Sequence, residues 1–303
     1  MSVDLRTTLG PVNLRTPLIA ASGTVGSVVD FASVADLTVY GAAVAKSVSG
    51  EPWSGRPAPR VAPAGMGMLN AIGIQNPGIE QWRTEVEPSL RGVGVPVWGS
   101  AVGHTAEEFA VVARGLEAAG VAAIEVNLSC PNLDGEMIAL DARQSERVVE
   151  AVRAVTSLPI AAKLSPNAPD IVSIAAACQH HGADWVVLTN TIWGAAIDIE
   201  SRRPSLASIV GGYSGVPLKP IAMRAVVEVH RSLPQLPIVG CGGVVSGRDV
   251  IEYLLAGASA VALGTIHFAD PKAGKRILRE LVGYCETHRI ASISELVGAM
   301  RPA

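Results

Sequence analysis

Short apolar runs alternate with longer segments in which apolar residues recur at helical spacing, and the alternation continues along most of the chain. The apolar runs are nearly unbroken, which is typical of parallel strands buried on both faces. They predict eight strands, over residues 18–21, 42–46, 95–100, 122–127, 160–164, 185–189, 238–240 and 260–264. The intervening periodic segments predict helices, for example over residues 105–119, 143–155, 169–181, 220–232 and 247–256.

Residues that favour helix ends mark the boundaries of these segments. Thr105, Asp170 and Ser246 stand near predicted helix starts. A glycine recurs between a helix end and the next strand, where left-handed C-terminal caps are common, at positions Gly41, Gly120, Gly182 and Gly257. Serial strand–helix units with eight strands predict an α/β fold, a (β/α)8 TIM barrel that forms a single domain over residues 1–303.

Three long segments interrupt this rhythm, over residues 48–78, 133–142 and 194–216. Long loops in a compact barrel are usually binding loops or lids, so we expect them to be inserted at the C-terminal face. Polar residues also end the predicted strands or directly follow them at their carboxyl ends, namely Ser22, Lys46, Ser47, Ser100, Asn127, Lys163, Thr189, Asn190 and Thr191. In a barrel all of these converge on the mouth where ligands bind.

Lys46 and Lys163 lie within otherwise apolar strands. A lysine is rarely buried without an anionic partner, so each could belong to a structural ion pair. The occurrence of both near Asn127 favours an anionic ligand at the mouth.

Glycines after the last two strands favour a phosphate site. Gly242 and Gly243 follow the seventh strand, and Gly264 and Thr265 follow the eighth. Barrels often bind phosphate with these two loops, through exposed backbone N–H groups. His267 is the histidine nearest the predicted mouth, and we interpret it as structural.

Residues 125–132 carry the strongest local signal for chemistry. A buried strand opens there onto Asn127, Ser129, Cys130 and Asn132. A single cysteine is most often an inert buried residue. Two amides beside it make a poor apolar core and a good hydrogen-bonding pocket, so Cys130 is the candidate catalytic residue.

Composition narrows the class of protein. The 303 residues are 49% hydrophobic with a net charge of −3 and no basic run, which gives no indication of nucleic-acid binding. The four cysteines form no CxxC pair, so we expect no metal site and no iron–sulfur cluster held by this chain. There is no apolar signal core and no run long enough to span a membrane, and we expect a cytoplasmic protein.

The chain resembles the class 1 dihydroorotate dehydrogenases, most closely the catalytic flavin subunit of class 1B. The resemblance covers nearly the whole chain and is most specific in residues 70–78 and 127–132, with further matches at residues 21–24, 46–47, 189–191, 211–215, 240–244 and 264–265. It implies a barrel that binds flavin mononucleotide (FMN) and oxidises dihydroorotate to orotate in pyrimidine synthesis. It also implies a homodimeric core with a partner subunit that carries FAD and a 2Fe–2S cluster and passes electrons to NAD.

The same resemblance implies roles for individual residues. Cys130 is expected to remove the C5 proton while a hydride passes from C6 to the flavin. The expected flavin contacts are Ser22, Lys46, Ser47, Ser100, Asn127, Lys163, Thr189, Gly215, Gly242, Gly243, Gly264 and Thr265. The expected substrate contacts are Lys46, Asn70, Ala71, Ile72, Gly73, Ile74, Asn127, Asn132, Asn190 and Thr191.

The sequence departs from the family pattern in three places. Ser100 stands where asparagine is usual, Cys241 occupies the glycine-rich turn, and the segment after Asn132 lacks the expected Gly-Gly and Phe-Gly elements. Three alternatives stay open: a fumarate-dependent class 1A enzyme, a flavin enzyme that reduces uracil or thymine, and a Schiff-base lyase with Lys163 or Lys46 as nucleophile. A non-catalytic binding barrel is disfavoured, because binding alone needs no base.

Overall fold

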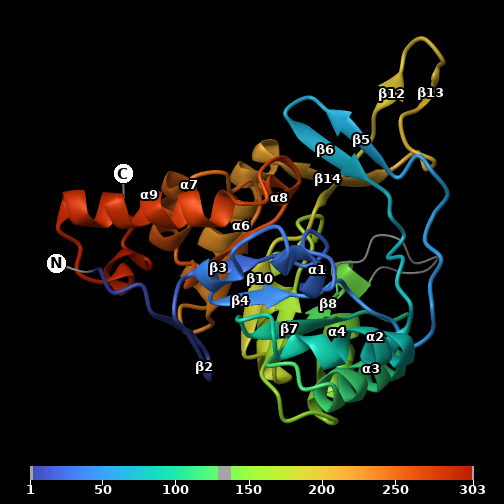
Figure 1. Ribbon diagram of the computed structural model, residues 1–303, viewed down its shortest axis with the longest axis horizontal. Coiled ribbons are helices and arrows are strands. Elements are labelled where there is room, and N and C mark those ends of the chain that lie inside the picture. Colours follow the sequence, from blue (N-terminus) through green and yellow to red (C-terminus); the bar gives the residue numbers. More distant parts are fainter. Residues whose placement is uncertain (1–2, 129–137, 302–303) are drawn as a thin grey trace.

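Eight parallel strands close into a barrel at the centre of the protein, in a computed structural model that describes residues 3–128 and 138–301 (Figure 1). Around the barrel the strand order is β3, β4, β7, β8, β9, β10, β15 and β16. Their bounds are β3 Leu18–Ala20, β4 Ala42–Val44, β7 Val97–Ala101, β8 Ala123–Asn127, β9 Ile160–Lys163, β10 Trp185–Leu188, β15 Ile238–Cys241 and β16 Ala260–Leu263. All eight predicted strands are therefore confirmed, with ends displaced by one or two residues.

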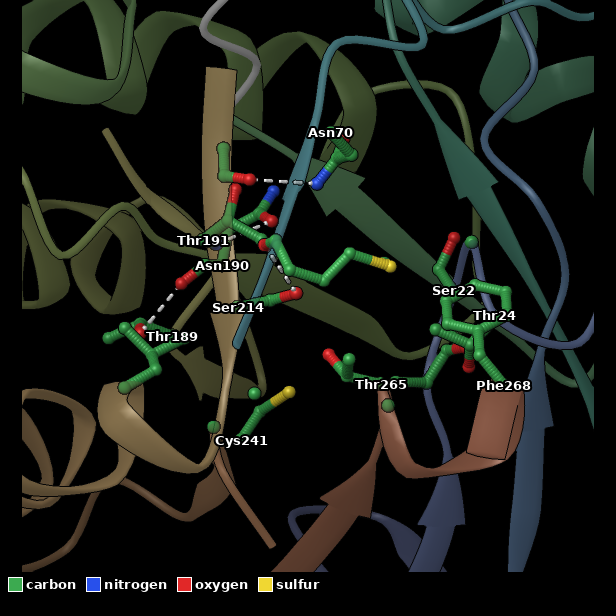
Figure 2. Close-up of a pocket in the computed structure, with 18 of the residues that line it drawn as sticks. Ser22, Thr24, Asn70, Thr189, Asn190, Thr191, Ser214, Cys241, Thr265 and Phe268 are labelled. Atoms are coloured by element: carbon green, nitrogen blue, oxygen red, sulfur yellow. Dashed lines mark hydrogen bonds between the residues drawn. The ribbon is translucent and has the colours of Figure 1, made fainter. Parts of the chain in front are cut away.

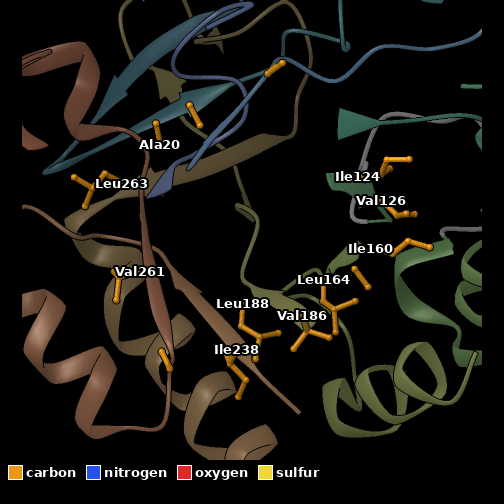
Figure 3. Packing of buried hydrophobic residues seen from close by; sticks show 14 of the residues in the cluster. Ala20, Ile124, Val126, Ile160, Leu164, Val186, Leu188, Ile238, Val261 and Leu263 are labelled. Carbon is orange, nitrogen blue, oxygen red and sulfur yellow. The ribbon is translucent and has the colours of Figure 1, made fainter. Parts of the chain in front are cut away.

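Side chains alternate between the two faces of each barrel strand. The outward set packs beneath the surrounding helices and includes Ile124 and Val126 of β8 and Val186 and Leu188 of β10 (Figure 3). The inward set fills the barrel, where Trp98 and Trp185 lie 5.0 Å apart between ring centroids and many of their neighbours are alanines. Two large rings packed among small side chains are an arrangement that allows close packing of the interior.

The helices run between the barrel strands and cover its outer surface (Figure 1). Their bounds are α1 Val29–Ala32, α2 Ile79–Leu90, α3 Ala106–Ala118, α4 Ala142–Arg153, α5 Ile171–His180, α6 Lys219–Ser232, α7 Gly247–Leu255, α8 Ile266–Ala269 and α9 Ala273–His288. Short 3-10 turns occupy η1 Leu37–Val39, η2 Ile138–Leu140, η3 Val216–Leu218 and η4 Ile293–Leu296. No helix in the described ranges is both long enough and apolar enough to cross a membrane.

The predicted helix starts are confirmed. The side chains of Thr105, Asp170 and Ser246 each accept a hydrogen bond from a backbone N–H in the first turn. Three of the four predicted glycine caps are also confirmed, because Gly120, Gly182 and Gly257 have positive φ.

The prediction for Gly41 is wrong. Its φ is not positive, and it follows the 3-10 turn η1. A Cβ on Gly41 would lie 2.5 Å from the carbonyl oxygen of Thr16, so close backbone approach, not a left-handed cap, explains this glycine.

Two of the predicted loops contain regular structure. Residues in segments 48–78 and 192–215 pair into an antiparallel sheet in the order β11 Ile192–Gly194, β14 Gly211–Gly215, β6 Gly67–Asn70 and β5 Val61–Ala64. A small hairpin, β12 Ile197–Asp198 and β13 Arg203–Pro204, extends from it (Figure 1). The sheet places Asn70 and Ser214 at the barrel mouth.

The hairpin of β1 Thr7–Leu9 and β2 Val12–Leu14 belongs to the opposite end of the barrel. Leu9 and Leu14 join the same apolar cluster as Trp185 and Trp98 inside the barrel. The hairpin therefore closes the end away from the mouth.

Candidate active site

A cavity of about 620 Å³ opens at the carboxyl ends of the barrel strands (Figure 2). Its walls come from the strand ends, from the loops after β15 and β16 and from the antiparallel sheet. The predicted site residues that line it are Ser22, Lys46, Ser47, Asn70, Ile72, Gly73, Ile74, Asn127, Lys163, Thr189, Asn190, Thr191, Gly215, Gly242, Gly243, Gly264 and Thr265. One cavity thus brings together most of the residues selected from the sequence.

Two predicted site residues of the described ranges, Ser100 and Ala71, do not line the cavity. Ser100 is fully buried behind Ser47, with 2.9 Å between the two hydroxyl oxygens. Ala71 is buried in a small apolar cluster beneath the antiparallel sheet. Cys130 and Asn132 lie outside the described residues.

An ion pair between Lys163 and Glu125 lies inside the barrel. The Lys163 Nζ is 3.4 Å from Glu125 Oε1, and the side chains are only 6% and 2% exposed. Burial lowers the pKa of Lys163, but the Glu125 carboxylate, with a smaller contribution from Cys241, outweighs burial and leaves this pKa raised. Lys163 therefore carries a positive charge into the cavity, with its counterion behind it.

Hydrogen bonds lock three of the polar side chains of the wall together. The Asn190 amide donates to Asn127 Oδ1 at 3.3 Å, and the Asn127 amide donates to Ser47 Oγ at 3.1 Å. Asn190 Oδ1 in turn accepts from the Thr191 backbone N–H at 2.7 Å. Each amide is thereby oriented before any ligand binds, which reduces the entropy lost on binding.

The loops after β15 and β16 form a cradle of backbone N–H groups, which we call the N–H cradle. It consists of Gly243, Val244, Gly264 and Thr265. None of these four backbone N–H groups donates a hydrogen bond to a residue within the described ranges 3–128 and 138–301. Such groups suit an oxyanion, and phosphate above all.

Gly243 cannot be replaced without strain in this cradle. Its φ is +67°, and an added Cβ would lie 2.8 Å from both Lys219 Cβ and Val216 O.

Cys241 and His267 are both buried beside the cavity. Cys241 lines it, and burial raises the pKa of its thiol despite the nearby Lys163 charge, so the thiol stays protonated at neutral pH. His267 lies behind the wall, where Nδ1 contacts Thr24 Oγ1 and Nε2 contacts Tyr40 Oη, both at 2.9 Å. Burial lowers the pKa of His267 to about 4. This neutral, fully bonded ring fits the structural role predicted from the sequence.

Comparison with known proteins places this cavity in a family. The family model described as "Dihydroorotate dehydrogenase" matches residues 4–284. The chain belongs to the dihydroorotate dehydrogenase family. Among its relatives, a protein from Geobacter sp. (strain M21) is 44% identical over 300 residues, which cover 98% of each chain. It is described as "Dihydroorotate dehydrogenase B (NAD(+)), catalytic subunit".

Two further members of the dihydroorotate dehydrogenase family carry the same description. The protein from Pelobacter propionicus is 44% identical over 303 residues, covering 99% of each chain. The protein from Alkaliphilus metalliredigens is 40% identical over 300 residues, covering 98% of this chain and 99% of its own. The similarity therefore runs through the whole barrel and is not confined to one motif.

Dihydroorotate dehydrogenases are flavin-dependent, and the cavity has features that suit a flavin nucleotide. The N–H cradle provides hydrogen-bond donors for a phosphate, and Lys163 provides a positive charge within the same cavity. The apolar side chains of Met68, Leu218 and Phe268 also line the cavity and offer apolar contact surface to a ligand.

Several residues in the cavity wall or directly behind it were not predicted from the sequence. Glu125 was overlooked although a lone carboxylate within a buried strand carries the same signal as a lone lysine. Ser214 and Phe268 also line the cavity, but Ser214 lies in a short glycine-rich strand and Phe268 in a four-residue helix. Neither local pattern distinguishes a binding residue from an ordinary loop residue.

Proposed function

We propose that this chain is the catalytic subunit of a NAD-linked dihydroorotate dehydrogenase, which oxidises dihydroorotate to orotate in pyrimidine biosynthesis. The observation that supports this most is the content of a single cavity, in which unpaired N–H groups, a buried lysine and interlocked asparagines face one another. We further propose that residues 1–303 form one FMN-binding domain.

FMN fits the chemistry of the donors in the cavity. Its phosphate would accept hydrogen bonds from the N–H cradle, with Gly215, Gly242, Ser22 and Thr189 along the remainder of the molecule. Lys163 would lie beside the ring and stabilise negative charge there. Bound FMN supplies hydride acceptance, which no amino-acid side chain can provide.

The substrate is a pyrimidine ring with a carboxylate, and other residues that line the same cavity suit both. Lys46 provides a cation for the carboxylate. Asn70, Asn127, Asn190 and Thr191 provide amide and hydroxyl groups for the ring edges. The backbone of residues 71–74 and the Asn132 side chain complete the proposed substrate contacts.

Cys130 is proposed as the base that removes the C5 proton of the substrate. This proton is weakly acidic, so its base must be positioned and its pKa must suit the task. A thiol acts as a base only as thiolate. Cys130 follows Asn127, a residue of the cavity wall, by three positions in the sequence.

Electrons must leave the cavity after each turnover. The relatives are described as the catalytic subunit of an NAD(+) enzyme, a description that implies a second subunit in those proteins. We propose the same for this chain, as a cytoplasmic homodimeric core with a partner subunit that carries FAD and a 2Fe–2S cluster.

Steady-state assays of the purified chain separate this function from its alternatives. We expect turnover of dihydroorotate with an artificial electron acceptor, and little turnover of dihydrouracil. Preference for dihydrouracil would indicate a different pyrimidine, and efficient use of fumarate would indicate a class 1A enzyme. Borohydride trapping of a substrate adduct on Lys163 or Lys46 would instead support a lyase.

A further inference from the structure

Arg276 of α9 connects the two loops that carry the N–H cradle. Both of its terminal nitrogens, Nη1 and Nη2, donate to the carbonyl oxygen of Val245 at 3.2 Å. Nη2 also lies 3.6 Å from Asp270 Oδ2. Val245 belongs to the loop after β15, and Asp270 directly follows α8, which begins in the loop after β16. A single guanidinium therefore joins the loop after β15 to the C-terminal end of α8, the short helix that continues from the loop after β16.

Carboxylates support the loop after β15 from behind. Asp249 Oδ2 accepts the backbone N–H groups of Val245 and Ser246 at 3.0 and 2.8 Å. Glu280 Oε2 accepts the N–H of Gly247 at 2.7 Å. Both polar groups of the Val245 backbone are thus held by the scaffold. The N–H groups of Gly243 and Val244, just before it, are left for a ligand.

This support places negative charge behind a site that suits an anion. Hydrogen bonding and ion pairing outweigh burial and lower the pKa of both Asp249 and Glu280, so both are ionised. Each has a cationic partner, since Lys219 Nζ lies 2.6 Å from Asp249 Oδ1 and Arg276 Nη1 lies 2.9 Å from Glu280 Oε1. Neither Lys219 nor Arg276 lines the cavity.

We propose that Arg276 is a positioning residue for phosphate, which fixes the distance between the two halves of the N–H cradle and neutralises the carboxylates behind it. The ligand it serves is the phosphate monoester of the flavin nucleotide, so the inference rests on the proposed function. Its action is indirect, through the carbonyl of Val245 and the carboxylates of Asp270 and Glu280.

The chain offers a matched control on the same helix. Arg279 is exposed and lies three residues after Arg276, and its side chain makes no hydrogen bond or ion pair with any residue of the described ranges. Replacing either arginine removes one positive charge from α9. Only the loss of Arg276 removes the connection between the two loops.

The test compares FMN with riboflavin, which lacks the phosphate, as ligands of the flavin-free chain. Dissociation constants are measured by quenching of flavin fluorescence for the natural chain, Arg276→Gln, Arg276→Lys and Arg279→Gln. We expect Arg276→Gln to lose roughly ten-fold or more of the preference for FMN over riboflavin, as expected for losing one charge-assisted contact. The affinity of Arg276→Gln for riboflavin should be unchanged. The preference for FMN over riboflavin should be intermediate in Arg276→Lys and the same as in the natural chain in Arg279→Gln.

Each outcome separates the inference from the function it rests on. If Arg276→Gln keeps the natural ratio of FMN to riboflavin affinity, Arg276 does not position the cradle, and the inference is overturned. An equal loss of both affinities would also overturn it, because a general structural defect does not distinguish the phosphate. If the natural chain binds neither flavin, or shows no preference for FMN, the proposed cofactor itself is wrong.

Discussion

Lys163 and Glu125 form a buried ion pair across neighbouring strands β9 and β8, with 3.4 Å between Nζ and Oε1. The strand register places Lys163 opposite Asn127, one inward-facing layer nearer the mouth than Glu125. The pair is therefore a dipole inside the barrel, with its positive end toward the cavity. Glu125 also accepts from Ser100 Oγ at 3.5 Å, and Ser100 contacts Ser47 of the cavity wall.

Breaking this pair should destabilise the protein. Glu125→Gln leaves the Lys163 ammonium buried without its counterion, and loss of one partner of a buried pair costs about 3–5 kcal/mol. Without the carboxylate, burial dominates and the pKa of Lys163 should fall. Urea unfolding of the natural and variant chains measures the free-energy difference. The double variant Glu125→Gln, Lys163→Met should recover part of the loss, and no recovery would mean that the pair is not coupled.

Cys130→Ser should slow the reduction of bound flavin by dihydroorotate by roughly 10²–10⁴-fold, the usual contribution of a positioned general base. A serine hydroxyl is far less acidic than a thiol and does not ionise near neutral pH. Flavin content, read from the absorbance of the purified variant, should stay at the natural level. Unchanged reduction in rapid-mixing experiments would remove Cys130 from the mechanism.

Lys46→Ala should weaken orotate binding more than FMN binding. A charged hydrogen bond contributes about 1.5–3 kcal/mol, so we expect the dissociation constant of orotate to rise roughly 10–100-fold. Titration of the flavin spectrum with orotate measures this, and fluorescence quenching measures FMN. Lys275→Ala, at an exposed position on α9, is the control for loss of a lysine charge. Equal orotate affinity in Lys46→Ala and the natural chain would refute the contact.

The buried His267 should make the protein less stable in mild acid. Its pKa is about 4 in the folded protein against an ordinary value of 6.5, so the unfolded chain binds the extra proton between these values. Folding stability attributable to this residue is thus present above pH 6.5 and is lost as the pH falls toward 4.

The loss attributable to His267 amounts to about 2 kcal/mol between pH 7 and pH 5. Urea unfolding of the natural chain and His267→Gln at both pH values isolates it, because the contribution of other groups cancels. The variant should show a smaller drop in stability than the natural chain. An equal drop in stability for the natural chain and the variant would mean that His267 has the same pKa in the folded and unfolded states.

The barrel itself could be predicted because its strands are buried on both faces. A strand such as β10 is apolar throughout, and its short unbroken apolar run differs from the spaced apolar positions of an amphipathic helix. The antiparallel sheet over the mouth gave no such signal. Its strands are three to five residues long, and β14 reads Gly-Gly-Tyr-Ser-Gly, which is typical of a turn.

Much of the candidate site could be predicted for the same reason, since the polar ends of parallel strands must meet at the mouth. Positions that act on the site through other residues could not be predicted from the sequence. Ser100 lies near the carboxyl end of β7, as Ser47 lies just beyond β4, yet Ser100 is behind the cavity wall. The register of β4 and β7 decides which of the two hydroxyls reaches the cavity. Arg276 is one of several charged residues on an amphipathic helix, and only tertiary structure brings it to Val245.

In the proposed function this barrel passes a hydride from dihydroorotate to a flavin. The visible absorbance of the flavin-loaded chain, recorded without oxygen before and after dihydroorotate is added, tests this step. We expect a yellow spectrum that bleaches as soon as a few equivalents of dihydroorotate are mixed in. A yellow protein that dihydroorotate does not bleach, or a chain that cannot be loaded with FMN, would contradict it.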